Sequence, residues 1–78
     1  MKICTWNING MSNKLAKPFV YNWLLDHDLC VLTEIHSKTI KNVPGFIMIV
    51  SKSLKEGRGG VALLIKREIQ AMIRYGLE

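Results

Sequence analysis

Three polar residues with suitable chemistry for a metal ion and a phosphate follow two apolar stretches of the sequence. Asn7 and Asn9 close an alternating segment that begins at Lys2, and Glu34 follows the continuous apolar run 29–33. Mg²⁺ binds through one or two carboxylates plus substrate phosphate oxygens, so a single strand-end carboxylate is a suitable ligand. An amide side chain can hydrogen-bond a phosphate oxygen or orient that carboxylate. The residue types therefore predict metal-assisted chemistry on a phosphoester, provided that the fold brings them together.

Each of these residues also has an ordinary structural explanation, and the sequence leaves both open. Glu34 can be a surface residue at a strand end, and Asn7 can be a buried structural amide in a strand pattern that disfavours Asn. Asn9-Gly10 is also a common turn dipeptide. His36 lies two residues past Glu34, where it can contact substrate, but from sequence we favour a solvent-exposed loop histidine.

A strand–helix–strand unit is needed to bring these residues to one edge, and the sequence predicts one. Residues 2–8 alternate, and 29–33 has the continuous apolar character of a parallel strand buried on both faces. Between them, 16–26 has apolar residues at helical spacing, and Pro18 fits only the first turn of that helix. The carboxyl ends of two parallel strands meet at the edge where open α/β sheets bind ligands. The apolar stripe consists of Ala16, Phe19, Val20, Trp23 and Leu24.

The second half of the chain predicts two further strands. Residues 46–50 form the third strand, and 61–65 form the fourth, antiparallel to the third. The glycines of 57–60 supply positive-φ positions and fit a hairpin turn. A phosphate-binding loop is the less favoured alternative, because it needs a helix to follow, and here a strand follows.

The predicted elements cover only one face of this sheet. Residues 10–14 are expected to form a polar loop and 66–70 a turn or single helical turn, and 71–75 are expected to begin a fifth strand. Continuous apolar strands require a layer on each face, and one layer is missing. We therefore expect an α/β fold in which residues 1–78 are the N-terminal part of a larger domain.

Composition limits the class of protein. The 78 residues allow at most one small domain, and 49% hydrophobic with 22% charged residues is typical of a folded chain. No apolar run reaches the roughly 18 residues of a membrane span, and no signal-peptide pattern is present, so we expect an intracellular protein. Cys4 and Cys30 lack a CxxC spacing, and His27 and His36 are too scattered to predict a zinc set, so we expect reduced core thiols.

The charge of the chain is concentrated in one region. The net charge is +5, and most of the excess lies in the loop–strand–loop region 36–58. A basic surface suits a polyanion such as nucleic acid, while a solubilising face is the alternative. The charged residues of this region are Lys38, Lys41, Lys52, Lys55 and Arg58, against Glu56 alone.

These motifs together resemble the opening of the endonuclease/exonuclease/phosphatase superfamily. The resemblance lies in KICTWNINGM at 2–11, DLCVLTE at 28–34 and GGVALLI at 59–65, with the amphipathic helix between the first two. Within the superfamily, the chain is most similar to the exonuclease III and apurinic-endonuclease branch. His36 after the glutamate and the Arg-Gly-Gly before the fourth strand resemble endonuclease domains of non-LTR retrotransposons.

The resemblance implies a four-layer α/β/β/α sandwich that hydrolyses phosphodiester or phosphomonoester bonds with Mg²⁺ or Mn²⁺. Glu34 matches the metal-ligand glutamate, Asn7 the asparagine of the catalytic network, and Asn9 a position that lines the site. Thr33 and Ile35 depart from the Gln and Thr that usually flank the glutamate. The family's tyrosine, Asp-x-Asn pair, later aspartate and final histidine lie beyond the last residue, so we expect an inactive fragment.

Three hypotheses for function follow. The first is the N-terminal piece of a metal-dependent DNA endonuclease of retrotransposon type, with DNA as partner, no membrane association and a nuclear localisation. The second is a phosphatase of the same superfamily that acts on phosphoinositides or another small phosphoester. The third is a non-catalytic remnant or a small basic binding module. The basic region and the Arg-Gly-Gly hairpin favour DNA.

Overall fold

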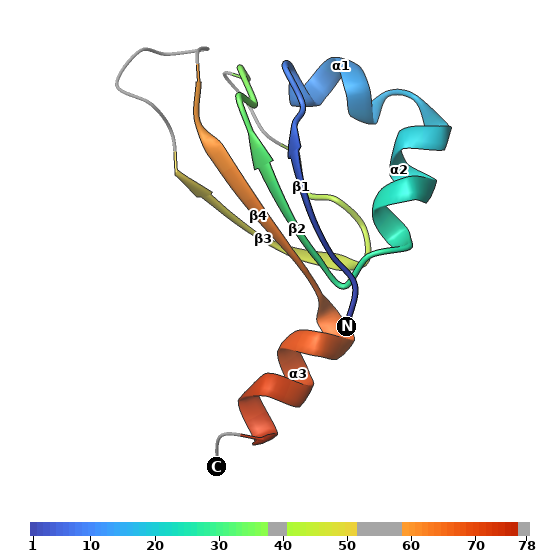
Figure 1. Cartoon of the computed structure of the whole chain (residues 1–78), viewed down its shortest axis with the longest axis vertical. Coiled ribbons are helices and arrows are strands. Elements are labelled where there is room, and N and C mark those ends of the chain that lie inside the picture. Colours follow the sequence, from blue (N-terminus) through green and yellow to red (C-terminus); the bar gives the residue numbers. More distant parts are fainter. Residues whose placement is uncertain (38–40, 52–58, 77–78) are drawn as a thin grey trace.

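Four strands form one mixed sheet, in the order β1-β2-β4-β3, in a computed structural model of the chain (Figure 1). The structure describes residues 1–37, 41–51 and 59–76. With three helices, this sheet confirms the predicted α/β fold class. In chain order the elements are β1 (Ile3–Asn7), α1 (Met11–Leu15), α2 (Pro18–Leu25), β2 (Leu29–Thr33), β3 (Phe46–Ser51), β4 (Val61–Lys66) and α3 (Arg67–Gly76).

The predicted strand–helix–strand unit is confirmed. β1 and β2 are parallel, with Ile3 opposite Leu29 and Asn7 opposite Thr33, and α2 provides the crossover between them. β4 lies beside β2 and is antiparallel to both β2 and β3, as expected for the third and fourth strands. The carboxyl ends of β1 and β2 therefore lie at the same edge of the sheet.

Pro18 determines where helix α2 begins. Lys17 caps it with an extended backbone (φ −95°), and Pro18 occupies the first turn, where a missing N–H costs nothing. Val20 and Leu24 are buried under the helix, but Phe19 is 70% exposed and Trp23 is 43% exposed. The apolar stripe predicted from sequence is thus buried unevenly: Val20 and Leu24 are fully covered, Trp23 packs edge-on against Trp6 of β1, and Phe19 faces solvent.

Two segments are more helical than the sequence indicated. The segment predicted as a polar loop is α1, which is anchored by the buried Met11, whose N–H donates to the Ile35 carbonyl at 2.8 Å. The helical turn that was one of the two expectations for 66–70 is the start of α3, with Glu68 in its first turn, where a negative charge favours a helix, and the fifth strand expected from 71 is wrong because α3 continues to Gly76. Ile73 and Tyr75 are residue types typical of strands, whereas Ile69 and Met72 recur at helical spacing.

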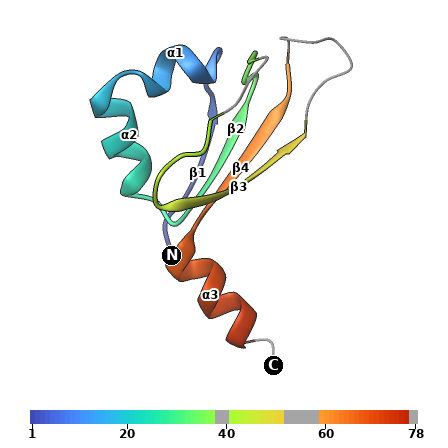
Figure 2. The same ribbon diagram turned by 180° about the vertical axis from the view of Figure 1, so that it is seen from behind.

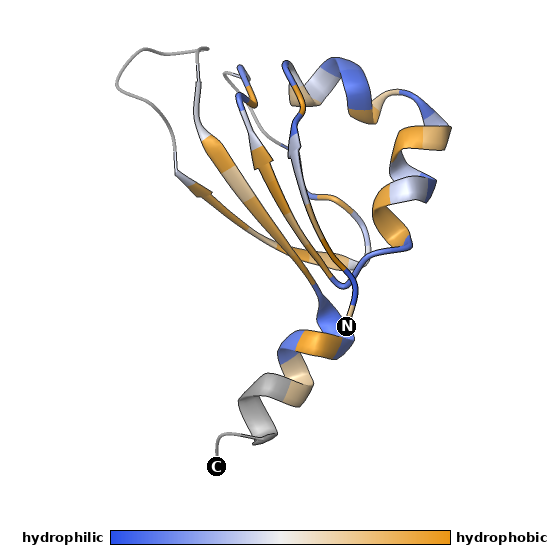
Figure 3. Cartoon of the chain, viewed as in Figure 1, coloured by the Kyte–Doolittle hydropathy of each residue, from blue (hydrophilic) through white to orange (hydrophobic). Residues whose placement is uncertain are grey.

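Helices cover only one face of the sheet. α1 and α2 lie on the same side, whereas α3 leaves the end of β4 and points away from the strands (Figures 1 and 2). No element of the described residues covers the opposite face, where Ile3 and Ile49 are each 58% exposed and Val61 is 41% exposed. Figure 3 shows how hydrophobic the strands on this sheet are. The buried core consists of Ile8, Met11, Val20, Leu24, Cys30, Leu32, Ile35, Val43, Phe46, Ala62 and Leu64.

Within the described residues, no helix is both long and apolar enough to cross a membrane. Of the five cations in the basic region, Lys41 is described, while the predictions for Lys38, Lys52, Lys55 and Arg58 lie outside the described residues.

Candidate active site

The carboxyl ends of β1 and β2 hold the residues that the sequence selected. The backbone pairing continues past both strands, because the Ile8 N–H donates to the Thr33 carbonyl at 3.0 Å and the Gly10 N–H donates to the Glu34 carbonyl at 3.0 Å. Asn7 lies opposite Thr33, one residue before Glu34. The two asparagines and the glutamate therefore share one edge of the sheet, as the parallel arrangement predicted.

This edge contains strained backbone. Asn9, Glu34 and His36 have φ of 48°, 52° and 45°, and they are the non-glycine residues with positive φ in the described part of the chain. Asn and His tolerate this region more often than most residues, but for Glu it is unfavourable by about 1–2 kcal/mol. Such strain persists where the surrounding structure enforces it, and it clusters at functional sites. Nothing in the residue pattern around Glu34 indicated this backbone conformation.

His36 is held in place beside Glu34. Its Nδ1 accepts a hydrogen bond from the Gly59 N–H at 2.7 Å, and its own N–H donates to the Gly59 carbonyl at 3.0 Å. An accepting Nδ1 places the proton of the neutral ring on Nε2, which lies 3.9 Å from Oε2 of Glu34. The His36 side chain is 32% exposed, so this loop histidine is only partly exposed to solvent.

The two amides are more open than the sequence suggested. Asn7 and Asn9 are both exposed, so the alternative of a buried structural amide at Asn7 is wrong. Asn7 projects from the strand face that lacks helices, because its neighbours Trp6 and Ile8 are turned toward the covered side. The described hydrogen bonds include none between the side chains of Asn7 and Glu34. Both groups are therefore available to a ligand at this edge.

Lys14 adds a cation that the sequence interpretation did not select. Its Nζ donates to the Asn9 carbonyl at 3.4 Å, and it projects from α1. α1 is also tied to the segment after Glu34, because the hydroxyls of Ser12 and Ser37 lie 3.0 Å apart. Because the sequence predicted a loop at 10–14, it did not indicate that Lys14 returns to this edge.

Mg²⁺ prefers oxygen ligands such as a carboxylate. Amide N–H groups donate hydrogen bonds to phosphate oxygens. The Glu34 side chain is 50% exposed, so its carboxylate can coordinate a cation that keeps most of its waters. The described residues therefore fit a metal held by one carboxylate, with hydrogen-bond donors beside it from His36, Lys14 and the amides.

Comparison with known proteins supports the superfamily. No protein-family model matches the chain, and no curated protein matches it significantly. Among solved structures, the chain is similar to the Xenopus laevis APE2 catalytic domain, an exonuclease III-like member of the endonuclease/exonuclease/phosphatase superfamily. The TM-score is 0.68 and the sequence identity is 31%, over 85% of this chain and 23% of that one. This chain thus spans about a quarter of the length of the structure it matches.

Proposed function

We propose that this chain is the N-terminal part of a Mg²⁺-dependent phosphodiesterase of the endonuclease/exonuclease/phosphatase superfamily, and that the intact protein is a DNA endonuclease of retrotransposon type. The observation that carries the proposal is the position of Glu34 at the end of β2, beside Asn7 and Asn9 at the end of the parallel β1. Similarity to the APE2 catalytic domain supports a nuclease-type activity, and because APE2-like nucleases act on DNA, it supports DNA as the partner.

In this proposal each residue at the edge has one task. Glu34 holds the metal, and a bound Mg²⁺ or Mn²⁺ polarises the phosphoryl oxygen and stabilises the charge that develops on it. Asn7 and Asn9 donate hydrogen bonds to phosphate oxygens, and the Nε2–H of His36 is a further donor beside Glu34. Lys14 adds positive charge near the bound phosphate. The group that activates the attacking water is expected from outside these 78 residues, so the chain should bind without cutting.

Paramagnetic broadening tests the metal site directly. Adding Mn²⁺ to the labelled 78-residue chain should broaden the NMR amide signals of 7–10 and 33–36 before all others. Glu34→Gln should remove that selective broadening, because it neutralises the carboxylate that the described residues place at this edge. Glu68→Gln changes an exposed carboxylate on α3 and should leave the broadening unchanged. Broadening that persists in Glu34→Gln, or that centres elsewhere, would overturn the proposal.

The substrate class is tested by binding. A short abasic DNA duplex should bind the chain with an affinity that falls steeply with salt, because phosphate contacts release counterions. Lys14→Gln should weaken this binding and lower the salt slope by about 1 if its Nζ contacts one phosphate. Tighter binding of inositol phosphates than of DNA at matched phosphate concentration would instead favour the phosphatase hypothesis.

A further inference from the structure

A cluster of two thiols and one imidazole lies on the helix-covered side of the sheet. The Sγ atoms of Cys4 and Cys30 and a ring nitrogen of His27 all lie within 4.8 Å of one another. Cys4 and Cys30 are paired across the parallel strands β1 and β2, and His27 belongs to the short link between α2 and β2. The sequence interpretation that the histidines are too scattered for such a set is wrong for His27, because the crossover returns it to Cys4.

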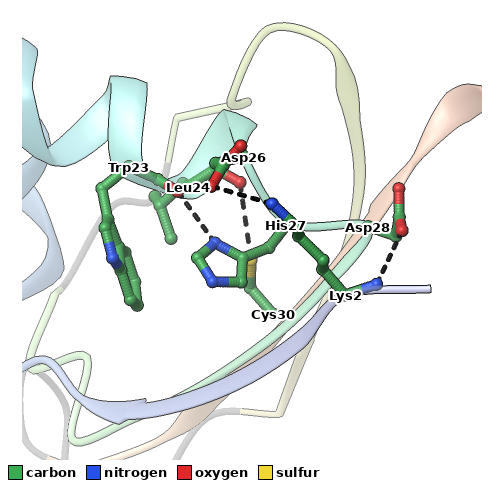
Figure 4. Close-up of polar contacts among 7 residues, drawn as sticks. All are labelled: Lys2, Trp23, Leu24, Asp26, His27, Asp28 and Cys30. Atoms are coloured by element: carbon green, nitrogen blue, oxygen red, sulfur yellow. Dashed lines mark hydrogen bonds and ion pairs between the residues drawn. The ribbon is translucent and has the colours of Figure 1, made fainter.

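The tautomer of His27 is fixed, and its ring is packed in place. Its Nδ1 lies 2.8 Å from the Trp23 carbonyl, and because a carbonyl only accepts, Nδ1 carries the hydrogen (Figure 4). The lone pair is therefore on Nε2. Metal-ligating histidines usually donate their other N–H to such a carbonyl, which fixes both the tautomer and the ring orientation. The Trp23 ring packs against the imidazole with the centroids 4.5 Å apart, which limits its rotation further.

The two cysteines differ in exposure. Cys30 is fully buried, and its Sγ lies 3.9 Å from the Leu24 carbonyl. Burial, with a further contribution from the hydrogen bond to Cys4, raises the pKa of the Cys30 thiol from 9.0 to about 12. Both cysteines are free, and Cys4 and His27 are only partly buried, so a solvated ion can reach the cluster from their side.

We propose that Cys4, His27 and Cys30 form a binding site for a thiolate-preferring transition-metal ion, with Zn²⁺ as the best match, and that water completes its coordination. A Cys₂His set with a fourth open position is an established zinc arrangement. Tetrahedral bonds of about 2.3 Å to sulfur and 2.0 Å to nitrogen place ligand atoms roughly 3.5–3.8 Å apart. Because the ligand atoms of the cluster lie at most 4.8 Å apart, reaching that spacing requires each pair to close by about 1.3 Å at most.

Binding at this site is balanced in charge. Zn²⁺ replaces the protons of the two thiols, and two H⁺ pass to solvent, so the metal with its two thiolates and the neutral imidazole carries no net charge. Binding therefore strengthens as pH rises. The ion would link β1, the start of β2 and the α2–β2 connection, which stabilises a chain of a size at which the core alone is marginal.

This site is distinct from the Glu34 edge. Cys30 lies four residues before Glu34 on β2, which is about 13 Å along a strand. Sulfur and imidazole ligands select Zn²⁺ and Co²⁺, whereas a carboxylate with waters suits Mg²⁺ and Mn²⁺. The two sites can therefore be titrated separately, and either can fail without the other.

Cobalt spectroscopy on the reduced 78-residue chain tests the proposal. One equivalent of Co²⁺ should produce thiolate-to-cobalt charge-transfer absorption and intense tetrahedral ligand-field bands, and one equivalent of Zn²⁺ should abolish both. His27→Asn retains an amide donor for the Trp23 carbonyl but removes Nε2, so it should weaken Co²⁺ binding at least about tenfold. Cys4→Ser and Cys30→Ala should remove the charge-transfer absorption of their own sulfur.

Two matched variants serve as controls. Asp26→Asn removes the carboxylate next to His27, which pairs with Lys2 at the surface, and it should leave the Co²⁺ spectrum and affinity unchanged. Glu34→Gln should also leave them unchanged, because it acts only on the other edge. Zn²⁺ should raise the thermal midpoint of the wild type and not that of His27→Asn, which covers the case in which Cys30→Ala fails to fold.

Three results would overturn the proposal. These are a folded, reduced chain without charge-transfer absorption at millimolar Co²⁺, undiminished affinity in His27→Asn, or loss of binding in Asp26→Asn. The Mn²⁺ broadening that depends on Glu34 is unaffected by any of them.

Discussion

Glu34 combines a functional side chain with an unfavourable backbone conformation. Its φ of 52° is enforced from both sides, by the Gly10 N–H on its carbonyl and by the hydrogen bond from the Ile35 N–H to the Gly60 carbonyl at 3.4 Å. A residue chosen for stability at this position would be Gly, which adopts positive φ without steric cost. A Glu at this position costs stability but places a carboxylate at the edge, as is typical of strained residues at functional sites.

Glu34→Gly is therefore expected to have opposite effects on stability and on metal binding. Glu34→Gly should raise the free energy of unfolding by about 1 kcal/mol, because it relieves the left-handed strain, and should abolish the selective Mn²⁺ broadening. The matched Glu68→Gly, in helix α3, should lower the free energy of unfolding by about 1 kcal/mol, because Gly is unfavourable in helices. Urea denaturation measures both. A Glu34→Gly chain less stable than the wild type would contradict the strain argument.

Cys30 predicts a pH dependence of stability in the absence of metal. Its pKa is raised from 9.0 to about 12, mainly by burial, so between these pH values the unfolded chain has lost a proton that the folded chain retains. The contribution of Cys30 to stability is therefore complete below pH 9.0 and is lost as the pH rises toward about 12. Denaturation in reductant and chelator at increasing pH should show this fall.

The contribution of Cys30 can be isolated from that of other groups that titrate in the same range. Cys30→Ala removes the thiol from an apolar site, so its stability should fall less steeply above pH 9.0 than that of the wild type. Equal slopes for the two proteins would show that the thiol has the same pKa when folded and unfolded.

At the scale of the element, α2 positions both the crossover and the Trp23 carbonyl that orients His27. Leu24 is fully buried beneath it, whereas Phe19 is 70% exposed on the same helix. Leu24→Ala should therefore lower the free energy of unfolding by about 2–5 kcal/mol, because it leaves a cavity. Phe19→Ala should change it by about 0.5 kcal/mol or less. Thermal denaturation of both variants measures this contrast, and equal losses would place the helix in a different rotation.

The sequence predicted the four strands and α2, but it missed α1 and the C-terminal part of α3. The strands carry alternating or continuous apolar runs, and Pro18 fixed the start of α2. α1 was missed because a five-residue helix has too little periodicity to distinguish it from a loop. Phe19 shows a further limit, since periodicity locates an apolar face but not which of its residues the sheet covers.

At the scale of the whole molecule, the site was predictable only as far as topology determines it. Two neighbouring parallel strands were sufficient to place Asn7 and Glu34 at one edge. The anchoring of His36 by Gly59 depends on a contact between segments 23 residues apart. The convergence of His27 with the two cysteines likewise follows from how the crossover closes, which the spacing of residues in the sequence does not reveal.

On the face of the sheet without helices, polarity changes from one end of the strands to the other. Two of its cross-strand rows are almost entirely apolar, and the third, at the Glu34 end, is mostly polar and includes Asn7. The apolar part of this face therefore ends at the proposed site. The three rows are Ile3, Leu29, Ile65 and Ile47, then Thr5, Val31, Leu63 and Ile49, then Asn7, Thr33, Val61 and Ser51.

This arrangement predicts that a polar substitution in β3 or β4 is tolerated on the face without helices and is destabilising on the face that the helices cover. Ile49→Thr should change the free energy of unfolding by about 0.5 kcal/mol or less, because Ile49 is 58% exposed and Thr keeps the β-branched shape. It should also raise the concentration at which the chain stays monodisperse in sedimentation, since exposed apolar patches promote aggregation. Leu64→Thr, which buries an unpaired hydroxyl in a fully covered position, should cost about 2–5 kcal/mol. If Ile49→Thr were as destabilising as Leu64→Thr, both faces of the sheet would be covered in solution.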